Sequence, residues 1–197
     1  MTAKLDLHPA TREVARLVGG ISDAQLDGPT PCTETSVAGL LDHLMGLATA
    51  FRDAATKSNG PDSGQASADA ANLDPGWREI LPGRLDELAD AWEDPDAWDG
   101  MTWAGGVEMP AEVMASVALD EVVLHGWDLA RATGQRFEVD LVSAQVVLEF
   151  TAASSEPGQE AMREGIFGPV VEVPEDAPVF DRALGFSGRD PGWTPPA

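Results

Sequence analysis

The sequence has one cysteine, few basic residues and no apolar run long enough to cross a membrane. Because Cys32 has no partner in the chain, an internal disulfide is excluded and a reducing, cytoplasmic compartment is expected. The 12 basic residues stand against 34 acidic ones, and the net charge of −22 repels nucleic-acid phosphates and anionic lipids. The N-terminus lacks a signal-peptide pattern. We therefore expect a cytoplasmic protein with a small-molecule substrate, and no nucleic-acid or membrane partner.

Several familiar functional motifs are also missing from the sequence. It contains no internal repeat, no glycine-rich phosphate loop, no paired-cysteine metal motif and no Gly-x-Ser-x-Gly nucleophile elbow. A Ser-His-Asp triad assembled from distant residues stays open. With 197 residues, 43% of them hydrophobic, the chain is long enough to bury a core. We expect one domain over residues 1–197, with bundle helices in about 1–155 and a wrapping tail in 156–197.

Hydrophobic periodicity and end signals predict an all-α fold. The expected helices cover about 7–18, 36–57, a segment from Trp77 to Trp92 that Pro82 kinks or begins, 110–134 and 141–153. Ser36 and Asp140 are the expected N-caps of the second and fifth helices. The connections at 58–73 and 94–109 are expected to be a mobile loop and an irregular segment, and 170–173 is a short extended candidate in the tail.

The most informative stretch is Asp-Glu-Val-Val-Leu-His-Gly-Trp-Asp, within the helix expected over 110–134. Glu121 and His125 are four residues apart, so their side chains lie one above the other on one helix face. Asp128 follows three residues later on nearly the same face. A Glu-x-x-x-His pair can supply two metal ligands from one helix, but it is also compatible with a simple polar contact.

A third ligand is available on the helix expected over 36–57. His43 lies between Leu40 and Leu47 at helical spacing, which predicts that it points into the core. A long connection between the second and third helices favours a bundle in which the fourth helix runs antiparallel to the second. At 1.5 Å per residue, His43 is then roughly 10 Å and His125 roughly 12 Å from the same end of the bundle.

The matched depths predict that His43, Glu121 and His125 meet. Two histidines and a glutamate that leave a fourth position open form a catalytic rather than a structural zinc arrangement. The residues alone leave a second alternative open, in which His43 is a core histidine bonded to a carbonyl group and the pair at 121 and 125 is only a polar contact.

Three stretches give the chain a family resemblance. They are Pro-Thr-Pro-Cys at 29–32, Leu-Leu-Asp-His-Leu at 40–44 and Leu-His-Gly-Trp-Asp-Leu-Ala-Arg-Ala-Thr-Gly at 124–134. In these stretches the chain resembles the DinB-like metalloenzyme superfamily, in the branch that contains the N-terminal domain of mycothiol-dependent maleylpyruvate isomerase. The ending Gly-Arg-Asp-Pro at 188–191 is similar to endings in that branch.

The resemblance implies an up-down-down-up four-helix bundle, here with an extra helix and an irregular C-terminal tail. It also implies a divalent metal, usually Zn²⁺, held by His43, Glu121 and His125, and a low-molecular-weight thiol such as mycothiol used for transfer or isomerisation. Asp128 is then the expected catalytic residue, orienting a ligand or exchanging protons. The chain departs from its relatives at Thr35, where a tryptophan is usual, and it is too short for the isomerase's second domain.

The alternative function is a non-catalytic bundle that binds a metal or ligand as a sensor or binding module. An open pocket over the metal position favours the enzyme, and a pocket plugged by the tail favours the module. Cys32 is expected to be a small hydrophobic residue in a loop, or a thiol activated by a nearby helix N-terminus. The oligomeric state is left open, with a homodimer as the alternative to a monomer.

Overall fold

The computed structural model describes residues 5–159, 163 and 166–196. The α-helices are α1 (His8–Gly19), α2 (Val37–Ala55), α3 (Trp77–Ala91), α4 (Ala111–Thr133), α5 (Leu141–Ala153) and α7 (Val179–Phe186). Three short 3₁₀ helices, η1 (Asp23–Gln25), η2 (Ala70–Asn72) and η3 (Pro95–Trp98), lie in the connections, and β1 (Met101–Ala104) pairs with β2 (Val107–Pro110). The predicted all-α class is confirmed, with one small hairpin added.

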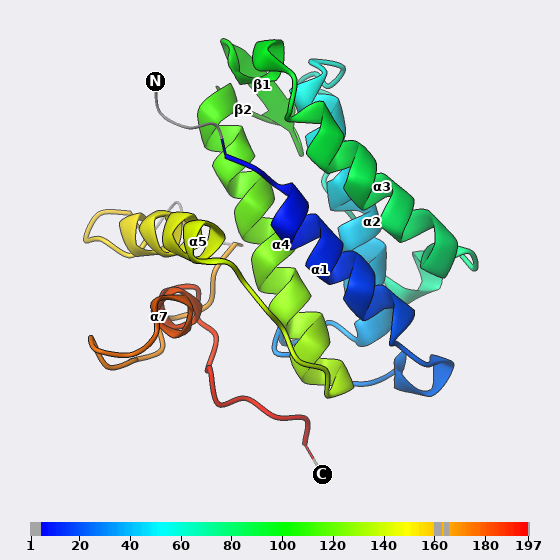
Figure 1. The fold of residues 1–197 in the computed structure, drawn as a ribbon, viewed down its shortest axis with the longest axis vertical. Coiled ribbons are helices and arrows are strands. Elements are labelled where there is room, and N and C mark those ends of the chain that lie inside the picture. Colours follow the sequence, from blue (N-terminus) through cyan, green and yellow to red (C-terminus); the bar gives the residue numbers. More distant parts are fainter. Residues whose placement is uncertain (1–4, 160–162, 164–165, 197) are drawn as a thin grey trace.

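The first four long helices form the predicted up-down-down-up bundle. In Figure 1, α1 and α4 run in one direction, and α2 and α3 run in the other. The helices α2 and α4 each pack against neighbours on two sides, and they contact one another directly. Their antiparallel contact confirms the arrangement on which the depth comparison of the two histidines depends.

The ends of the helices follow from local sequence. The side chain of Ser36 accepts a hydrogen bond from the Gly39 N–H at the start of α2, and the carboxylate of Asp140 accepts two at the start of α5. Gly134 ends α4 in a left-handed conformation (φ 70°), which glycine adopts without steric cost. The helix α3 begins at Trp77, so Pro82 lies inside it and does not mark its start.

The prediction of an irregular connection over 94–109 was wrong. The segment contains η3 and the antiparallel hairpin of β1 and β2. Gly105 and Gly106 both have positive φ (56° and 78°), as a two-residue hairpin turn requires, and Gly-Gly is a sequence signal for such a turn. The Thr102 hydroxyl donates to the Ala54 carbonyl at 2.6 Å, which fixes the hairpin against the end of α2.

The described part of the C-terminal region contains α7, a helix that was not predicted. It packs against α5 beside the bundle (Figure 1). The extended candidate at 170–173 forms no strand, because its backbone lies against α7 instead of a strand partner. The Val171 N–H donates to the Gly185 carbonyl at 2.9 Å. The segment at 170–173 is therefore held by a hydrogen bond to a short helix.

The connection between α2 and α3 lies against the face of α2 that carries His43. A Cβ atom added at Gly39 would be 2.7 Å from the carbonyl oxygen of Ala68, and one added at Gly46 would be 2.9 Å from the Cβ of Ala66. The two glycines are four residues before and three after His43, on the same face. Their lack of side chains lets the loop backbone approach the histidine.

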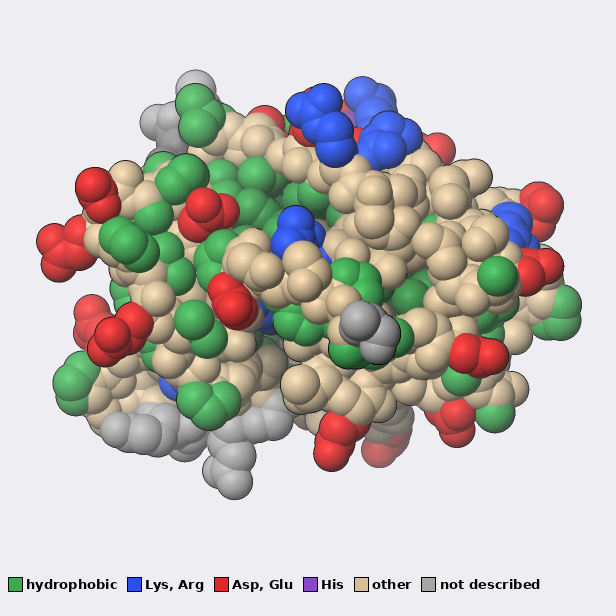
Figure 2. All heavy atoms as spheres, turned by 90° about the horizontal axis from the view of Figure 1, so that it is seen from below, with side chains coloured by type: hydrophobic (Ala, Val, Ile, Leu, Met, Phe, Trp, Pro, Cys, Tyr) green, Lys and Arg blue, Asp and Glu red, His purple; other side chains and the backbone are tan. Residues whose placement is uncertain are grey.

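The charge imbalance is visible on the surface. Figure 2 shows acidic side chains spread over the displayed face among hydrophobic and uncharged groups. Within the described part of the chain, no helix is both long and apolar enough to cross a membrane.

The close approach of the loop gives a prediction that can be checked in a matched pair of variants. Replacing a helical glycine by alanine ordinarily stabilises a helix by about 1 kcal/mol. Gly83 in α3 has no atom within 4 Å of an added Cβ, so Gly83→Ala should be stabilising. Gly39→Ala should instead lower the free energy of unfolding by about 1–3 kcal/mol, because the methyl group meets backbone. Urea unfolding measures both changes, and a stabilising Gly39→Ala would contradict the packing described here.

Candidate metal centre

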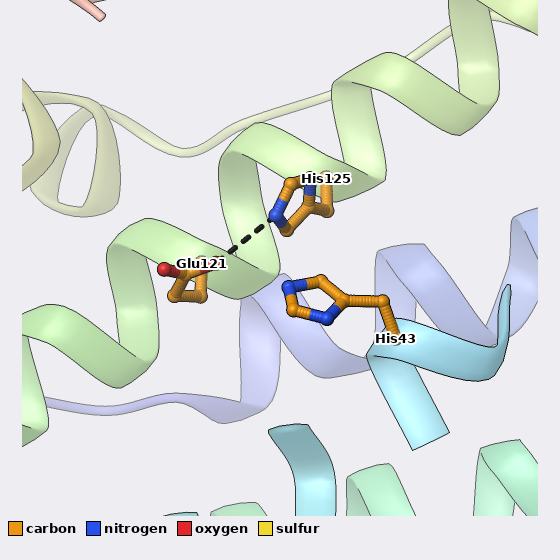
Figure 3. A group of neighbouring side chains, drawn as sticks. All are labelled: His43, Glu121 and His125. Carbon is orange, nitrogen blue, oxygen red and sulfur yellow. Dashed lines mark ion pairs between the residues drawn. The ribbon is translucent and has the colours of Figure 1, made fainter. Parts of the chain in front are cut away.

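The side chains of His43, Glu121 and His125 converge between α2 and α4 (Figure 3). Each offers one ligand atom, and these three atoms all lie within 4.8 Å of one another. The closest pair is His125 Nε2 and Glu121 Oε2, at 3.0 Å. Ligand atoms 2.0–2.2 Å from a tetrahedral ion are about 3.4 Å apart, so the arrangement fits a divalent cation with small side-chain adjustments.

A backbone carbonyl fixes the orientation of His43. Nδ1 of its imidazole donates a hydrogen bond to the Ser67 carbonyl at 3.1 Å. In the neutral ring this leaves Nε2 with a free lone pair, which is the atom that a metal would use. The rings of His43 and His125 meet edge to face, with centroids 5.1 Å apart. The loop held against Gly39 and Gly46 thus supplies the group that orients the ligand.

A carboxylate fixes the orientation of His125 in the same way. Its Nδ1 donates to Asp128 Oδ2 at 3.1 Å, and Asp128 is fully buried. Arg189 from the tail donates to both oxygens of that carboxylate, through Nε at 2.9 Å and Nη2 at 2.7 Å. Asp128 therefore lies behind His125 as a positioning group, and the same carboxylate ties the C-terminal tail to α4.

These contacts move the pKa values of the two histidines in opposite directions. Burial lowers the pKa of His43, and the nearby charge of His125 lowers it further. Burial also acts to lower the pKa of His125, but its hydrogen bonds to Asp128 and Glu121 prevail and raise the pKa to about 10. In the absence of a metal, His43 is neutral near pH 7 and His125 carries a proton between two carboxylates.

Carboxyl groups are concentrated around the proposed ligands. Asp120, Glu121 and Asp128 are all held on α4 close to one another, and Arg189, whose side chain is 10% exposed, faces them. Burial raises the pKa of Asp120 well above its usual range, and the charge of Glu121 adds to the effect. Its Oδ1 is buried without a hydrogen-bond partner. Two imidazoles and a carboxylate are a donor set that Zn²⁺ and similar divalent cations take in proteins, so the residues present fit such an ion.

A cavity of about 590 Å³ opens at the three ligands. Apolar residues of α2 and α4 line much of it, including Leu47, Phe51 and Met114. The hairpin turn, the Cys32 loop and the tail segments 166–169 and 187–189 complete its wall. The tail thus forms a side of the pocket without filling it. Small-molecule sites are apolar cavities of this size with a few polar groups.

The structure brings together all the residues singled out in the sequence. His43, Glu121 and His125 meet as the matched depths predict, and Asp128 contacts His125. That they bind a metal stays a prediction. Cys32 is half-buried and lines the cavity. Asp120 and Arg189 were missed. The sequence shows Asp120 as a carboxylate directly before Glu121, and Arg189 as an arginine in the tail of an acid-rich chain. Neither feature by itself predicts that the side chain is buried at the site.

Fold and site together define a class of protein, a helical bundle whose central helices present two histidines and a glutamate to a pocket. Residues 7–130 match the family described as the mycothiol maleylpyruvate isomerase N-terminal domain. The chain belongs to this family.

Solved structures share the fold, and two sequence relatives match most of the chain. The crystal structure of the mycothiol-dependent maleylpyruvate isomerase is 15% identical with a TM-score of 0.57, over 77% of this chain and 71% of that one. A mutant of that isomerase gives 16% identity and the same TM-score and coverage. Uncharacterized protein Rv0738 of Mycobacterium tuberculosis is 28% identical over 188 residues, 89% of this chain and 91% of the relative. The counterpart named MT0763, from a second strain, matches equally.

The opposite pKa shifts predict distinct titrations for the two histidines in metal-free protein. The imidazole of His125 should titrate near pH 10, and that of His43 below 6.5. With three histidines in the chain, side-chain NMR signals can be assigned by single substitutions. Asp128→Asn should bring the His125 midpoint down, since the variant loses one of the carboxylates that stabilise the imidazolium.

The same shift predicts how stability varies with pH. The folded-state pKa of His125 lies above its unfolded value of about 6.5. Its ion pairs therefore stabilise metal-free protein fully below that value, and this contribution disappears as the pH rises through about 10. Urea unfolding between these pH values should show the loss in wild type and a smaller loss in Asp128→Asn. A midpoint of 6.5 for both histidines, with no such loss, would contradict the ion-paired arrangement.

Proposed function

We propose that the protein is a metal-dependent enzyme, with Zn²⁺ as the preferred ion, that uses a low-molecular-weight thiol such as mycothiol. The reaction class is a transfer or isomerisation on a small molecule. His43, Glu121 and His125 would hold the ion, and residues 1–197 would act as one domain. The observation that carries the proposal is the convergence of three ligand atoms at the opening of a cavity.

The chemistry follows from what these side chains do. A bound divalent ion supplies a Lewis acid that lowers the pKa of a thiol, so that the thiol is nucleophilic near neutral pH. The Ser67 carbonyl and Asp128 hold the Nδ1–H groups of the two histidines and direct both Nε2 atoms to one point. Apolar residues such as Leu47 and Phe51 line the rest of the cavity.

Asp128 is proposed to act through His125. Its oxygens are occupied by His125 and by the two donors of Arg189, and it has no exposed surface. Burial acts to raise the pKa of Asp128, but the charge of Arg189 prevails and keeps the carboxyl ionised. Asp128 therefore suits orientation of a ligand better than exchange of a proton with a substrate, and Arg189 itself lines the cavity.

The alternative, a non-catalytic sensor or binding module, receives less support. A tail that plugged the space over the ligands would favour the module. The tail residues Phe167, Gly188 and Arg189 instead form part of the wall of an open cavity. The space left beside the three ligands, about 590 Å³, is sufficient for a small molecule.

Metal content gives the first test. Protein purified without added metal or chelator should contain about one divalent ion per chain, and His43→Ala should lose it while keeping its helical content. His8→Ala is the matched control, because His8 forms a second group with Asp90 and Glu93, two residues whose side chains are 71% and 70% exposed. Glu121→Gln should weaken binding because it removes a charged ligand. Equal metal content in the His43→Ala and His8→Ala variants would refute the proposed site.

Thiol activation gives a second test. A thiol with an ordinary pKa of about 8.5 is mostly protonated at pH 7, so binding as a thiolate should release about one proton. Titration of Zn²⁺-loaded protein with mycothiol in two buffers of different ionisation enthalpy measures that release by calorimetry. The S-methyl derivative of mycothiol is the control, because it has no thiol proton. Binding of mycothiol without proton release would show that its sulfur is not activated.

A further inference from the structure

The Asp120 carboxyl group is buried but not satisfied by the fold. The residue is 2% exposed, and its Oδ1 has no hydrogen-bond partner. Within the described residues, His8 Nδ1 is the other buried side-chain atom in that state. A buried carboxyl oxygen without a donor costs stability, whereas an apolar side chain of similar size would cost little there. Asp120 therefore does not contribute to the stability of α4.

The same carboxyl group borders the cavity of the proposed metal site. Asp120 is three residues after Val117 and four before Leu124, so the three side chains lie along one side of α4. All three line the cavity, together with Glu121 and His125 from the adjacent face. Asp120 thus places a carboxyl group, with an oxygen that can accept a hydrogen bond, among apolar groups and next to a proposed ligand of the metal.

A cavity with an unpaired carboxyl group discriminates between ligands, because a ligand without a hydrogen-bond donor leaves that carboxyl group unpaired. A ligand that fills the apolar cavity removes water from the carboxyl group. If the ligand brings no N–H or O–H donor to that point, the carboxyl group stays buried and unpaired, and binding is weakened. If it brings a donor, the hydrogen bond forms to an acceptor that the fold has left free.

We propose that Asp120 is a specificity-determining residue that accepts a hydrogen bond from an N–H or O–H group of the bound thiol. The proposal rests on the function proposed above. The ligand class that follows is a thiol in which a hydrogen-bond donor lies a few bonds from the sulfur, because Asp120 directly precedes Glu121. Thiols of the same size and shape that lack the donor should be rejected.

A pair of small thiols that differ in one atom group tests this directly. N-acetylcysteamine carries an amide N–H two carbons from its sulfur, and 2-mercaptoethyl acetate has an ester oxygen in that place. Co²⁺-loaded protein reports binding of either thiol through the sulfur-to-cobalt absorption band. Wild-type protein should bind the amide thiol at least about tenfold more tightly than the ester.

Variants at position 120 assign that preference to the carboxyl group. Asp120→Leu should bring the ratio of the two affinities to about one, and Asp120→Asn, which keeps an acceptor oxygen, should retain part of it. Glu112→Gln is the matched control, since Glu112 is an exposed acidic residue at the start of the same helix. It should leave the ratio unchanged. Because the fold gains nothing from Asp120, Asp120→Leu should unfold at the same or a higher urea concentration than wild type.

The outcomes separate this proposal from the one on which it rests. Absence of the cobalt band with every thiol would overturn the proposed function, and this inference with it. A band with both thiols but equal affinities in wild type would overturn the inference alone. The inference alone would also be overturned if Asp120→Leu lowered the affinity for both thiols equally, or if it kept the tenfold preference for the amide thiol.

Discussion

The structure depends on pairing the charge that α4 buries. Asp128 has no exposed surface, and an ionised carboxylate in such a place is tolerated only with charged partners. It has two, because His125 approaches from its own helix and Arg189 from the tail. One interaction therefore orients a proposed metal ligand and attaches the C-terminal segment to the bundle. The wall that the tail adds to the cavity follows from that attachment.

Glycines have a comparable role on the other side of the site. Gly39 and Gly46 have no side chains on the face of α2 that bears His43, and the connection between α2 and α3 occupies the space. The Ser67 carbonyl then meets Nδ1 of the imidazole. Both histidines thus receive a hydrogen-bond acceptor behind the ring, one from a backbone and one from a carboxylate. Such partners are common behind metal-binding histidines, because they fix the tautomer and the direction of the free nitrogen.

The sequence was sufficient for the parts that depend on periodicity and spacing. The bundle order and the convergence of His43 with the pair on α4 follow from helix rise and antiparallel packing. The sequence was insufficient where contacts between distant segments determine the structure. The hairpin could have been found from Gly105-Gly106, whereas α7 and the Arg189 contact depend on which surface the tail meets. In the sequence nothing distinguishes Asp120 from an exposed polar residue beside Glu121, because its burial depends on the packing around α4.

The proposed function requires His43, Glu121 and His125 to hold an ion and to present it to a thiol. X-ray absorption at the zinc edge tests that claim most directly, on Zn²⁺-loaded protein with and without mycothiol. The account predicts nitrogen and oxygen neighbours at about 2.0–2.2 Å that include two imidazoles, and one added sulfur at about 2.3 Å with mycothiol. A spectrum without two imidazoles, or without sulfur after saturation with mycothiol, would contradict it.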